Sequence, residues 1–310
     1  MEKTTIASLS REISTEAEAY AYLESLRWGG YPTCAHCGSE AVSYMTPKNG
    51  TSRKTRTGSL SERRVWQCRD CRKQFSVTTG TVMDRTKISV RTWVMVFFEL
   101  CASKNGVAAR EIERKYGLCP RTLWHMTQRI RAAMANNNGG LFSGIVEADE
   151  MYVGKRQRGK GSGMIDKLPV VTLVERGGRA RSTIPVSGSA IEALPIVVDG
   201  VKPGTAVVTD SSALYSDLHH YVAKHETVNH SAKEWGRGVW HTNTVEGFFG
   251  MFRRSVSGTH HFVTNKHVAR YLAEHDFRYS TRRATDSDRM AALLRQVEGP
   301  LRYKTLTGRR

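Results

Sequence analysis

The sequence contains no long apolar run. None of its apolar stretches approaches the ~20 residues that a helix needs to cross a bilayer, so we expect no transmembrane segment. The N-terminal stretch MEKTTIASLSREIST also lacks the apolar core of a secretory signal peptide. These two absences favour a cytoplasmic protein, and we expect a bacterial one that is associated with the nucleoid.

Cysteines and acidic residues are both scarce. The chain has six cysteines in 310 residues, and in a reducing cytoplasm we expect them to stay free of disulfides. Lys and Arg number 47 against 29 Asp and Glu, which gives a net charge of +18. This excess attracts polyanions without selecting a fold, and nucleic acid is the obvious polyanion. A basic protein without such a partner can have the same balance, so the motifs have to decide.

Four of the cysteines form two CxxC pairs, in CAHC and CRDC: Cys34, Cys37, Cys68 and Cys71. Two such pairs present four thiolates for a tetrahedral zinc site. We therefore expect one structural Zn²⁺ in a zinc ribbon over residues 31–80, with a redox dithiol as the alternative. His36 lies inside the first pair and could replace a cysteine. The remaining Cys101 and Cys119 are expected to be packed core thiols.

Helical patterns surround this ribbon. An N-terminal helix is expected at residues 11–27, within an N-terminal region over 1–30, and an apolar helix at 88–102. Two more helices, at 106–116 and 120–134, flank the stop signal GLCP. The last helix has an apolar face, which predicts that its other side chains face solvent or a DNA groove: Arg121, Trp124, Gln128, Arg129 and Arg131. We expect a DNA-binding helix-turn-helix within residues 81–140; a plain helical hairpin is the alternative.

The second half of the chain is rich in strand-like patterns. Strands are predicted at 144–153, 168–175, 179–186 and 205–210, and helices near 189–194, 242–254 and 265–279. This order favours an α+β or α/β multidomain protein whose RNase H-like domain, over residues 141–285, has a mixed sheet flanked by helices. Residues 286–310 are expected to form a C-terminal helix and a loose basic tail.

Three acids stand at informative places in this half. Asp149 and Asp210 lie in strand-like runs, IVEADEMYVG and TAVVTD, and Glu246 lies in the helix-like HTNTVEGFFG. Carboxylates from two strands and a helix can converge on two divalent metal ions, and such a site drives in-line displacement at phosphodiesters. Strand alternation places Glu147 on the face of Asp149 and turns Glu150 away. The alternative is that three of the 29 acidic residues in this chain occupy such positions by chance.

These motifs together resemble the IS1595 (ISXO2-like) family of bacterial insertion-sequence transposases. The resemblance runs from about Ala19 to Arg283 and is carried by CAHCGSE, WQCRDCRKQF, RTLWHMTQRIRAAM, IVEADEMYVG, VVTDSSALY and HTNTVEGFFGMFRRSVSGTHH. It implies a zinc ribbon, a helix-turn-helix and a Mg²⁺-dependent RNase H-like catalytic domain with two metal ions. The implied partners are DNA, as terminal inverted repeats and target, and further copies of the chain in a homodimer or larger assembly.

The resemblance also implies roles for individual residues. Asp149 and Asp210 match the two aspartates of the family's motif, whose third position is Asn, Glu or His. This chain offers both Asn243 and Glu246 there, and we favour Glu246 because an ionised carboxylate binds Mg²⁺ better than an amide does. Arg253 or Arg254 stands where the family carries a basic residue, although Lys is more usual.

A glycine-rich basic loop at 154–163 is a further candidate DNA contact. It carries four cations and no acid: Lys155, Arg156, Arg158 and Lys160. A solvated loop without a ligand is the alternative. Two other functions also remain open for the whole chain. One is a DNA-binding regulator with an inactive RNase H-like domain, and the other is a metal-dependent nuclease that cuts without joining strands.

Overall fold

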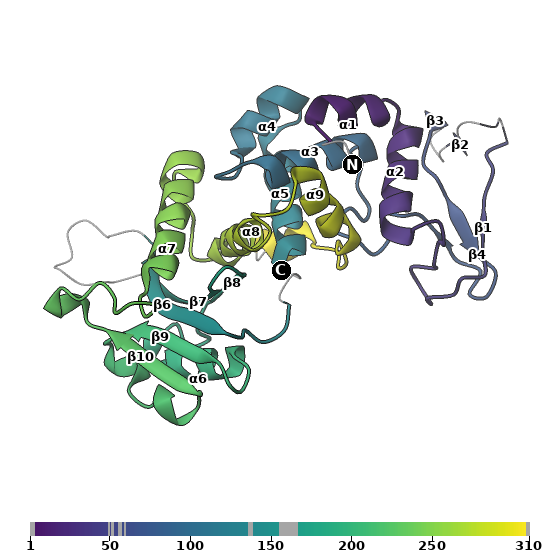
Figure 1. The fold of residues 1–310 in the computed structure, drawn as a ribbon. Coiled ribbons are helices and arrows are strands. Elements are labelled where there is room, and N and C mark those ends of the chain that lie inside the picture. The colour runs from purple at the N-terminus through teal and green to yellow at the C-terminus, as the bar shows by residue number, and fades with distance from the viewer. Residues whose placement is uncertain are drawn as a thin grey trace. The chain divides into compact units, whose positions relative to one another are not determined.

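The computed structural model describes residues 4–48, 50, 53–54, 58, 60–135, 139–154 and 167–307 (Figure 1). The chain forms two compact units. The first contains residues 1–103, 107–136 and 284–310, and the second contains 104–106 and 137–283. Among the described helices, none is both long and apolar enough to cross a membrane. The four cations of the predicted loop, Lys155, Arg156, Arg158 and Lys160, lie outside the described residues.

The first unit is mainly helical. Its helices are α1 (Ile6–Glu12), α2 (Glu16–Trp28), α3 (Val90–Ala102), α4 (Ala109–Tyr116), α5 (Pro120–Ala135), α9 (Asp286–Arg295) and α10 (Tyr303–Thr307). The apolar sequence of α3 makes it the centre of this unit, and α1, α2 and α9 pack against it (Figure 1). The single helix predicted at 11–27 is instead two helices, because Thr15 caps α2 in a capping box with Glu18.

The C-terminal segment returns to complete the helical unit. The side chains of Met290, Leu293 and Leu294 in α9 are fully buried. The backbone N–H of Val82 donates to the carbonyl of Val297 at 2.8 Å. The loose tail expected here is wrong for its first part, since Leu306 in α10 is also fully buried.

Helix α5 is packed on more than one side, which contradicts the predicted exposure of three polar residues. Gln128 is fully buried, and Arg129 and Arg131 are 8% and 2% exposed. The Arg129 guanidinium donates to the Asp84 carbonyl at 2.7 Å and lies 5.4 Å from the Trp93 ring centroid. Gln128 and Arg129 are therefore not available to a DNA groove. The prediction assumed one buried face, and the 81–86 segment covers part of the other.

The zinc-ribbon segment consists of short antiparallel strands. β1 (Val42–Tyr44), β4 (Trp66–Cys68) and β5 (Gln74–Phe75) form one sheet, and β2 (Arg53–Lys54) pairs with β3 (Leu60–Ser61). Trp28, at the end of α2, packs edge-to-face against Trp66 and Phe75, with ring centroids 5.9 and 6.0 Å apart. Glu24 in α2 accepts hydrogen bonds from Arg64 Nε at 2.7 Å and Trp66 Nε1 at 2.9 Å. These contacts attach the ribbon to α2.

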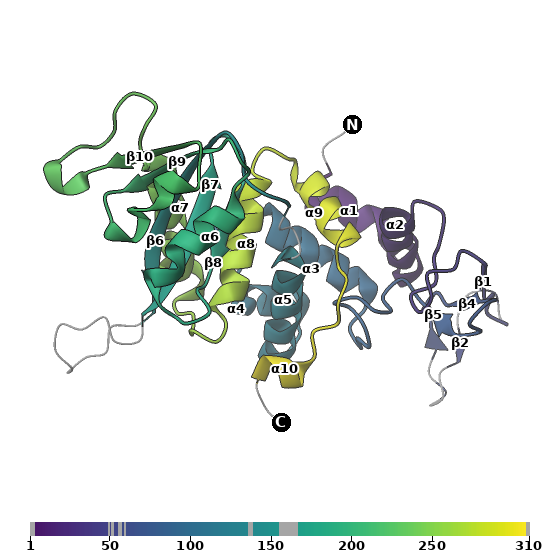
Figure 2. The same ribbon diagram turned by 90° about the horizontal axis from the view of Figure 1, so that it is seen from below.

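The second unit is built on a five-stranded mixed sheet with the order β10-β9-β6-β7-β8 (Figure 2). Its strands are β6 (Ile145–Val153), β7 (Leu168–Glu175), β8 (Ala180–Thr183), β9 (Ala206–Asp210) and β10 (Lys224–Val228). β6, β7 and β8 pair antiparallel, whereas β9 and β10 run parallel to β6. The sequence analysis missed β10, because KHETV is a polar edge strand without an apolar run.

Helices cover both faces of this sheet. α7 (Asn243–Ser255) and α8 (Val268–Ser280) pack on one face, and α6 (Ala193–Gly200) packs on the other (Figures 1 and 2). Strand alternation explains the division. Met151 of β6 packs with Phe248 of α7, whereas Val146 and Ala148 pack with Val197 of α6. The predicted strands and the helices predicted near 242–254 and 265–279 are confirmed, apart from small shifts at their ends. The helix predicted near 189–194 is a 3-10 turn over Ala190–Glu192 followed by α6, which extends to Gly200.

Candidate active site

Three carboxylates meet at one end of the sheet. Asp149 lies in β6, Glu150 follows it, and Asp210 is the last residue of β9. Each offers one carboxylate oxygen, and these three atoms lie within 4.8 Å of one another. The parallel pairing of β6 with β9 ends at Glu147↔Val208, so the two strands bring Asp149 and Asp210 to the same end of their ladder. A metal-sized cluster of oxygen ligands results.

Glu150 is the member of this cluster that the sequence analysis missed. Its backbone position lies on the α6 face, as alternation predicts, but its carboxylate reaches the two aspartates, so the expectation that it points away is wrong. It faces Tyr215, a residue 1% exposed, and burial raises the pKa of both groups. The Glu150 Oε1 atom and the Tyr215 hydroxyl are buried, and neither makes a well-formed hydrogen bond within the described part of the chain.

The electrostatics of the cluster favour a bound cation. The pKa of Asp149 is raised to about 7, mainly by burial and in smaller part by the nearby carboxylates of Asp210, Glu150 and Glu246. The hydrogen bond from the Glu150 backbone N–H to Asp149 Oδ1, at 2.7 Å, acts in the opposite direction and lowers the pKa of Asp149. Carboxylates held this close repel one another unless a proton or a cation lies between them. The oxygen donor set and the unsatisfied Glu150 oxygen fit a hard divalent ion such as Mg²⁺.

Glu147 has a structural partner in place of a metal. It is fully buried, and its carboxylate accepts the backbone N–H groups of Thr244 and Val245 at 2.8 and 3.0 Å. Arg176 Nε also donates to it at 2.7 Å. An acid at a helix N-terminus satisfies free N–H groups and complements the helix dipole. Glu147 therefore fixes the start of α7, which carries both candidates for the third ligand.

Those two candidates, Asn243 and Glu246, are both exposed on the first turn of α7. Glu246 lies near enough to Asp149 to raise its pKa, although it is not part of the 4.8 Å cluster. Its Oε1 atom accepts from Thr242 Oγ1 at 2.8 Å and lies 3.1 Å from His230 Nε2. Arg253 and Arg254 are exposed in the last turn of the same helix.

The predicted zinc thiols also come together. The sulfur atoms of Cys34, Cys37, Cys68 and Cys71 all lie within 4.8 Å of one another, with Cys34–Cys71 at 3.7 Å and Cys37–Cys68 at 3.6 Å. A tetrahedron with Zn–S bonds of about 2.3 Å has S–S edges of about 3.8 Å, so this spacing fits zinc. His36 instead lies 3.2 Å from the Gln74 carbonyl.

The two single cysteines differ. Cys101 is fully buried, as predicted for a core thiol. Cys119 is exposed, so the same prediction is wrong for it. Cys119 immediately precedes α5, and its sulfur lies 3.0 Å from Thr122 Oγ1, in the position of a helix cap rather than in a core.

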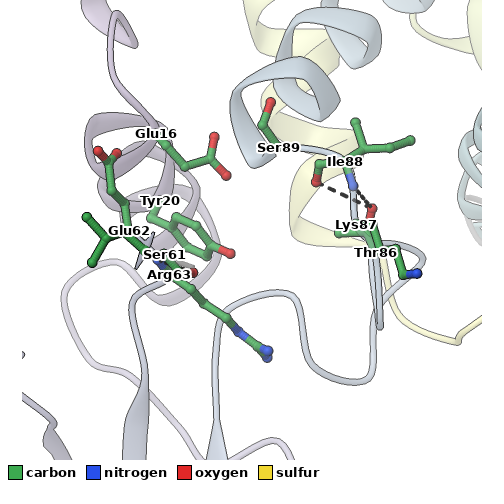
Figure 3. Close-up of a pocket in the computed structure, with 10 residues that line it drawn as sticks. Glu16, Tyr20, Ser61, Glu62, Arg63, Thr86, Lys87, Ile88 and Ser89 are labelled. Carbon is green, nitrogen blue, oxygen red and sulfur yellow. Dashed lines mark hydrogen bonds between the residues drawn. The ribbon is translucent and has the colours of Figure 1, made fainter. Parts of the chain in front are cut away.

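The helical unit contains a polar pocket that does not offer comparable chemistry. It is lined by residues of α2, of the 60–63 segment that contains β3, and of the 86–89 segment, among them Glu16, Arg63 and Lys87 (Figure 3). Glu16 is already engaged, because its carboxylate accepts the N–H groups of Val90 and Arg91 at 2.6 and 3.1 Å and so caps α3. Within the described residues, the two groups with metal-ligand spacing are the four thiols and the acidic cluster.

A zinc ribbon, a mixed α/β domain and clustered acids are the features of a transposase, and comparison with known proteins agrees. Residues 141–280 match the ISXO2-like transposase domain, and residues 14–74 match the transposase zinc-ribbon domain. The chain belongs to the IS1595 family of insertion-sequence transposases. A Halobacterium salinarum protein, described as an uncharacterized protein in transposable element ISH50, is 26% identical over 298 residues. That alignment covers 90% of this chain and 96% of the relative.

Proposed function

We propose that this chain binds the terminal inverted repeats of its insertion sequence and catalyses metal-dependent DNA cleavage and strand transfer. The observation that carries the proposal is the meeting of Asp149 and Glu150, from the middle of β6, with Asp210 at the end of β9. The strand order β10-β9-β6-β7-β8, with β9 and β10 parallel to β6, supports an RNase H-like fold for this domain. The zinc ribbon, the α4–α5 pair and the charge of +18 support DNA as the partner.

The residues divide into ligands and positioning groups. Asp149, Asp210 and Glu150 are the proposed ligands for Mg²⁺, and Glu246 completes the set from α7. Glu147 and Arg176 hold the first turn of α7 in place. Two Mg²⁺ ions bound there would clamp the attacking and leaving oxygens of the phosphodiester. The carboxylates themselves do not attack the phosphorus.

A strand-transfer assay tests the proposal directly. The full chain is incubated with Mg²⁺, a duplex that ends in the element's terminal repeat, and a supercoiled target plasmid. Cleaved ends followed by joined products are expected. Cleavage without joining would favour the nuclease instead, and binding without cleavage would favour the regulator. Sedimentation of the protein–DNA complex tests the expectation that two or more copies of the chain assemble on the DNA.

The third ligand can be identified by substitution. We expect Glu246→Gln to reduce cleavage on the order of 100-fold at limiting Mg²⁺, because it removes a charge that competes with the ion's hydration shell. Glu150→Gln is expected to reduce it similarly, and Asn243→Ala less. Cleavage rates measured across a Mg²⁺ titration separate weakened metal binding from other defects. If Asn243→Ala is the most severe of the three, the amide takes the place that we assign to Glu246.

DNA binding by the α4–α5 pair is best tested at Arg121, which is exposed at the start of α5. Arg121→Ala is expected to weaken binding to the terminal repeat and, if Arg121 contacts a phosphate, to reduce the salt slope by about one. Trp124, which is half-buried, is a second candidate. Arg129→Ala is the matched control: it is expected to lower the free energy of unfolding by about 2 kcal/mol through lost packing and hydrogen bonding. Affinity and salt dependence are measured by fluorescence anisotropy.

A further inference from the structure

The segment between β10 and α7, residues 229–242, presents an exposed tryptophan. Trp235 is 63% exposed, which is unusual for so large an apolar side chain. Its ring lies 5.5 Å from the ring of His230, with 42° between the planes. Lys233, two positions earlier, is also exposed. The indole therefore has a neighbour on one side and solvent on much of the rest.

Several contacts fix the conformation of this segment. Arg237 and Trp240 exchange backbone hydrogen bonds at 2.8 and 3.0 Å. Arg237 also forms an ion pair with Glu234 at 2.7 Å. Arg176, which binds Glu147, donates to the carbonyl of His241 at 2.9 Å and also to that of Val239. The segment is thus tied to the same groups that fix the start of α7, and Trp235 is displayed by a supported loop.

A short series of contacts links Trp235 to the acidic cluster. His230, which lies against the indole, has its Nε2 atom 3.1 Å from Glu246 Oε1 and 3.0 Å from Thr242 Oγ1. Glu246 in turn interacts electrostatically with Asp149. Trp235 therefore stands within two side chains of the acids that we propose to act on DNA. A bound strand whose phosphodiester lies at these acids would place its neighbouring nucleotides near this loop.

We infer that Trp235 stacks on an unpaired nucleobase of the DNA end, next to the phosphodiester held at the acidic cluster. This inference rests on the proposed function and adds a binding site for one base to it. Stacking on an exposed indole tolerates any base, because every base has a π-face, and it contributes about 1–3 kcal/mol. Lys233, an exposed cation two positions from the indole, can contact the phosphate backbone of the same strand. The site selects a separated strand over a paired one, since a paired base cannot offer its face.

Binding without divalent cations tests the inference apart from catalysis. Two duplexes carry the same terminal repeat, one fully paired and one with its last three nucleotides unpaired on one strand. Trp235→Ala is expected to weaken binding to the unpaired end by about 5- to 160-fold, from the stacking energy above, and to affect the paired duplex much less. Trp235→Phe keeps an aromatic face and is expected to stay close to the unsubstituted chain. A 2-aminopurine in the unpaired end should report the stacking as quenched fluorescence that Trp235→Ala abolishes.

Tyr221→Ala provides the matched control. Tyr221 is also an exposed aromatic residue, at 59%, but it precedes β10 and so lies beyond the opposite end of that strand from Trp235. Tyr221→Ala is expected to leave the affinities for both duplexes unchanged.

Equal binding of Trp235→Ala and the unsubstituted chain to the unpaired end overturns the inference. An equal loss on both duplexes with a lowered Tm also overturns it, and assigns Trp235 a structural role. Loss of self-association with unchanged DNA binding overturns it in favour of a second copy as partner. Failure of the unsubstituted chain to cleave in Mg²⁺ would instead count against the proposed function.

Discussion

Replacing Asp149 or Asp210 with asparagine is expected to abolish DNA cleavage while leaving binding to the terminal repeat intact. Each substitution preserves the size of the side chain but removes one of the charges that hold the metal ions. We expect a loss on the order of 10³-fold in the cleavage rate, equivalent to about 4 kcal/mol of transition-state stabilisation. Cleavage of a labelled terminal-repeat duplex gives the rate, and a gel-shift assay without metal gives the binding.

Replacing Asp149 with asparagine should also stabilise the folded state of the metal-free protein. The folded-state pKa of Asp149, about 7, lies above its ordinary value of 3.8, so between these values the folded chain binds more protons than the unfolded chain. Stability from this group is therefore present at low pH and is lost as the pH rises towards 7. At pH 8 without Mg²⁺, Asp149→Asn is expected to have the higher Tm, and Mg²⁺ should raise the Tm of the unsubstituted chain only.

Asp199→Asn is the control for both measurements, because Asp199 is an exposed acid on α6 outside the cluster. It is expected to change neither the cleavage rate nor the response of the Tm to Mg²⁺. Full cleavage by Asp149→Asn in Mg²⁺ would show that the acids are not the metal site. A lowered Tm in that variant would show that its loss of cleavage reflects misfolding.

Replacing Cys68 with serine is expected to remove zinc and unfold the ribbon. Cys68 is 1% exposed and packs with Phe75 at the centre of a small cluster that has few other apolar side chains. Such a module depends on its metal, and apparent binding free energies for structural zinc are about 10–16 kcal/mol. Elemental analysis should give one zinc per chain before the substitution and almost none after it.

Cys119→Ser separates this effect from the loss of any thiol. Cys119 is exposed and lies outside the four-thiol cluster, so its replacement should leave the zinc content and the ribbon unchanged. Limited proteolysis reports ribbon unfolding as new cleavage within residues 31–80. A Cys68→Ser protein that keeps its full zinc content would rule out the four-cysteine assignment.

Much of this architecture could be predicted from local patterns. The CxxC pairs, the strand runs and the acids within or at the end of those runs are short-range signals, and the structure brings the predicted thiols and both aspartates together. Glu150 shows the limit of such reasoning. Alternation correctly gives the face of its backbone, but the reach of its carboxylate depends on β9 ending at Asp210 and on Tyr215 behind it. Both conditions depend on tertiary structure, which a local sequence pattern does not report.

Helix α5 shows a second limit. Its apolar positions predict one buried face, whereas Gln128, Arg129 and Arg131 outside that face are buried as well. Arg129 is satisfied there by the Asp84 carbonyl, a partner 45 residues earlier in the chain. No periodicity in α5 itself could reveal that contact. Strand β10 was missed for the related reason that an edge strand needs little apolar surface.

The return of the chain to its first unit has a consequence for synthesis. Met290, Leu293 and Leu294 of α9 are fully buried in a unit whose helices other than α9 and α10 lie before residue 136. A ribosome makes those residues only after the whole sheet of the second unit has emerged. The helical unit therefore cannot reach its final packing during the first half of translation. We expect the sheet to fold first. The surface of α3 that α9 covers stays uncovered until synthesis of the polypeptide is nearly complete.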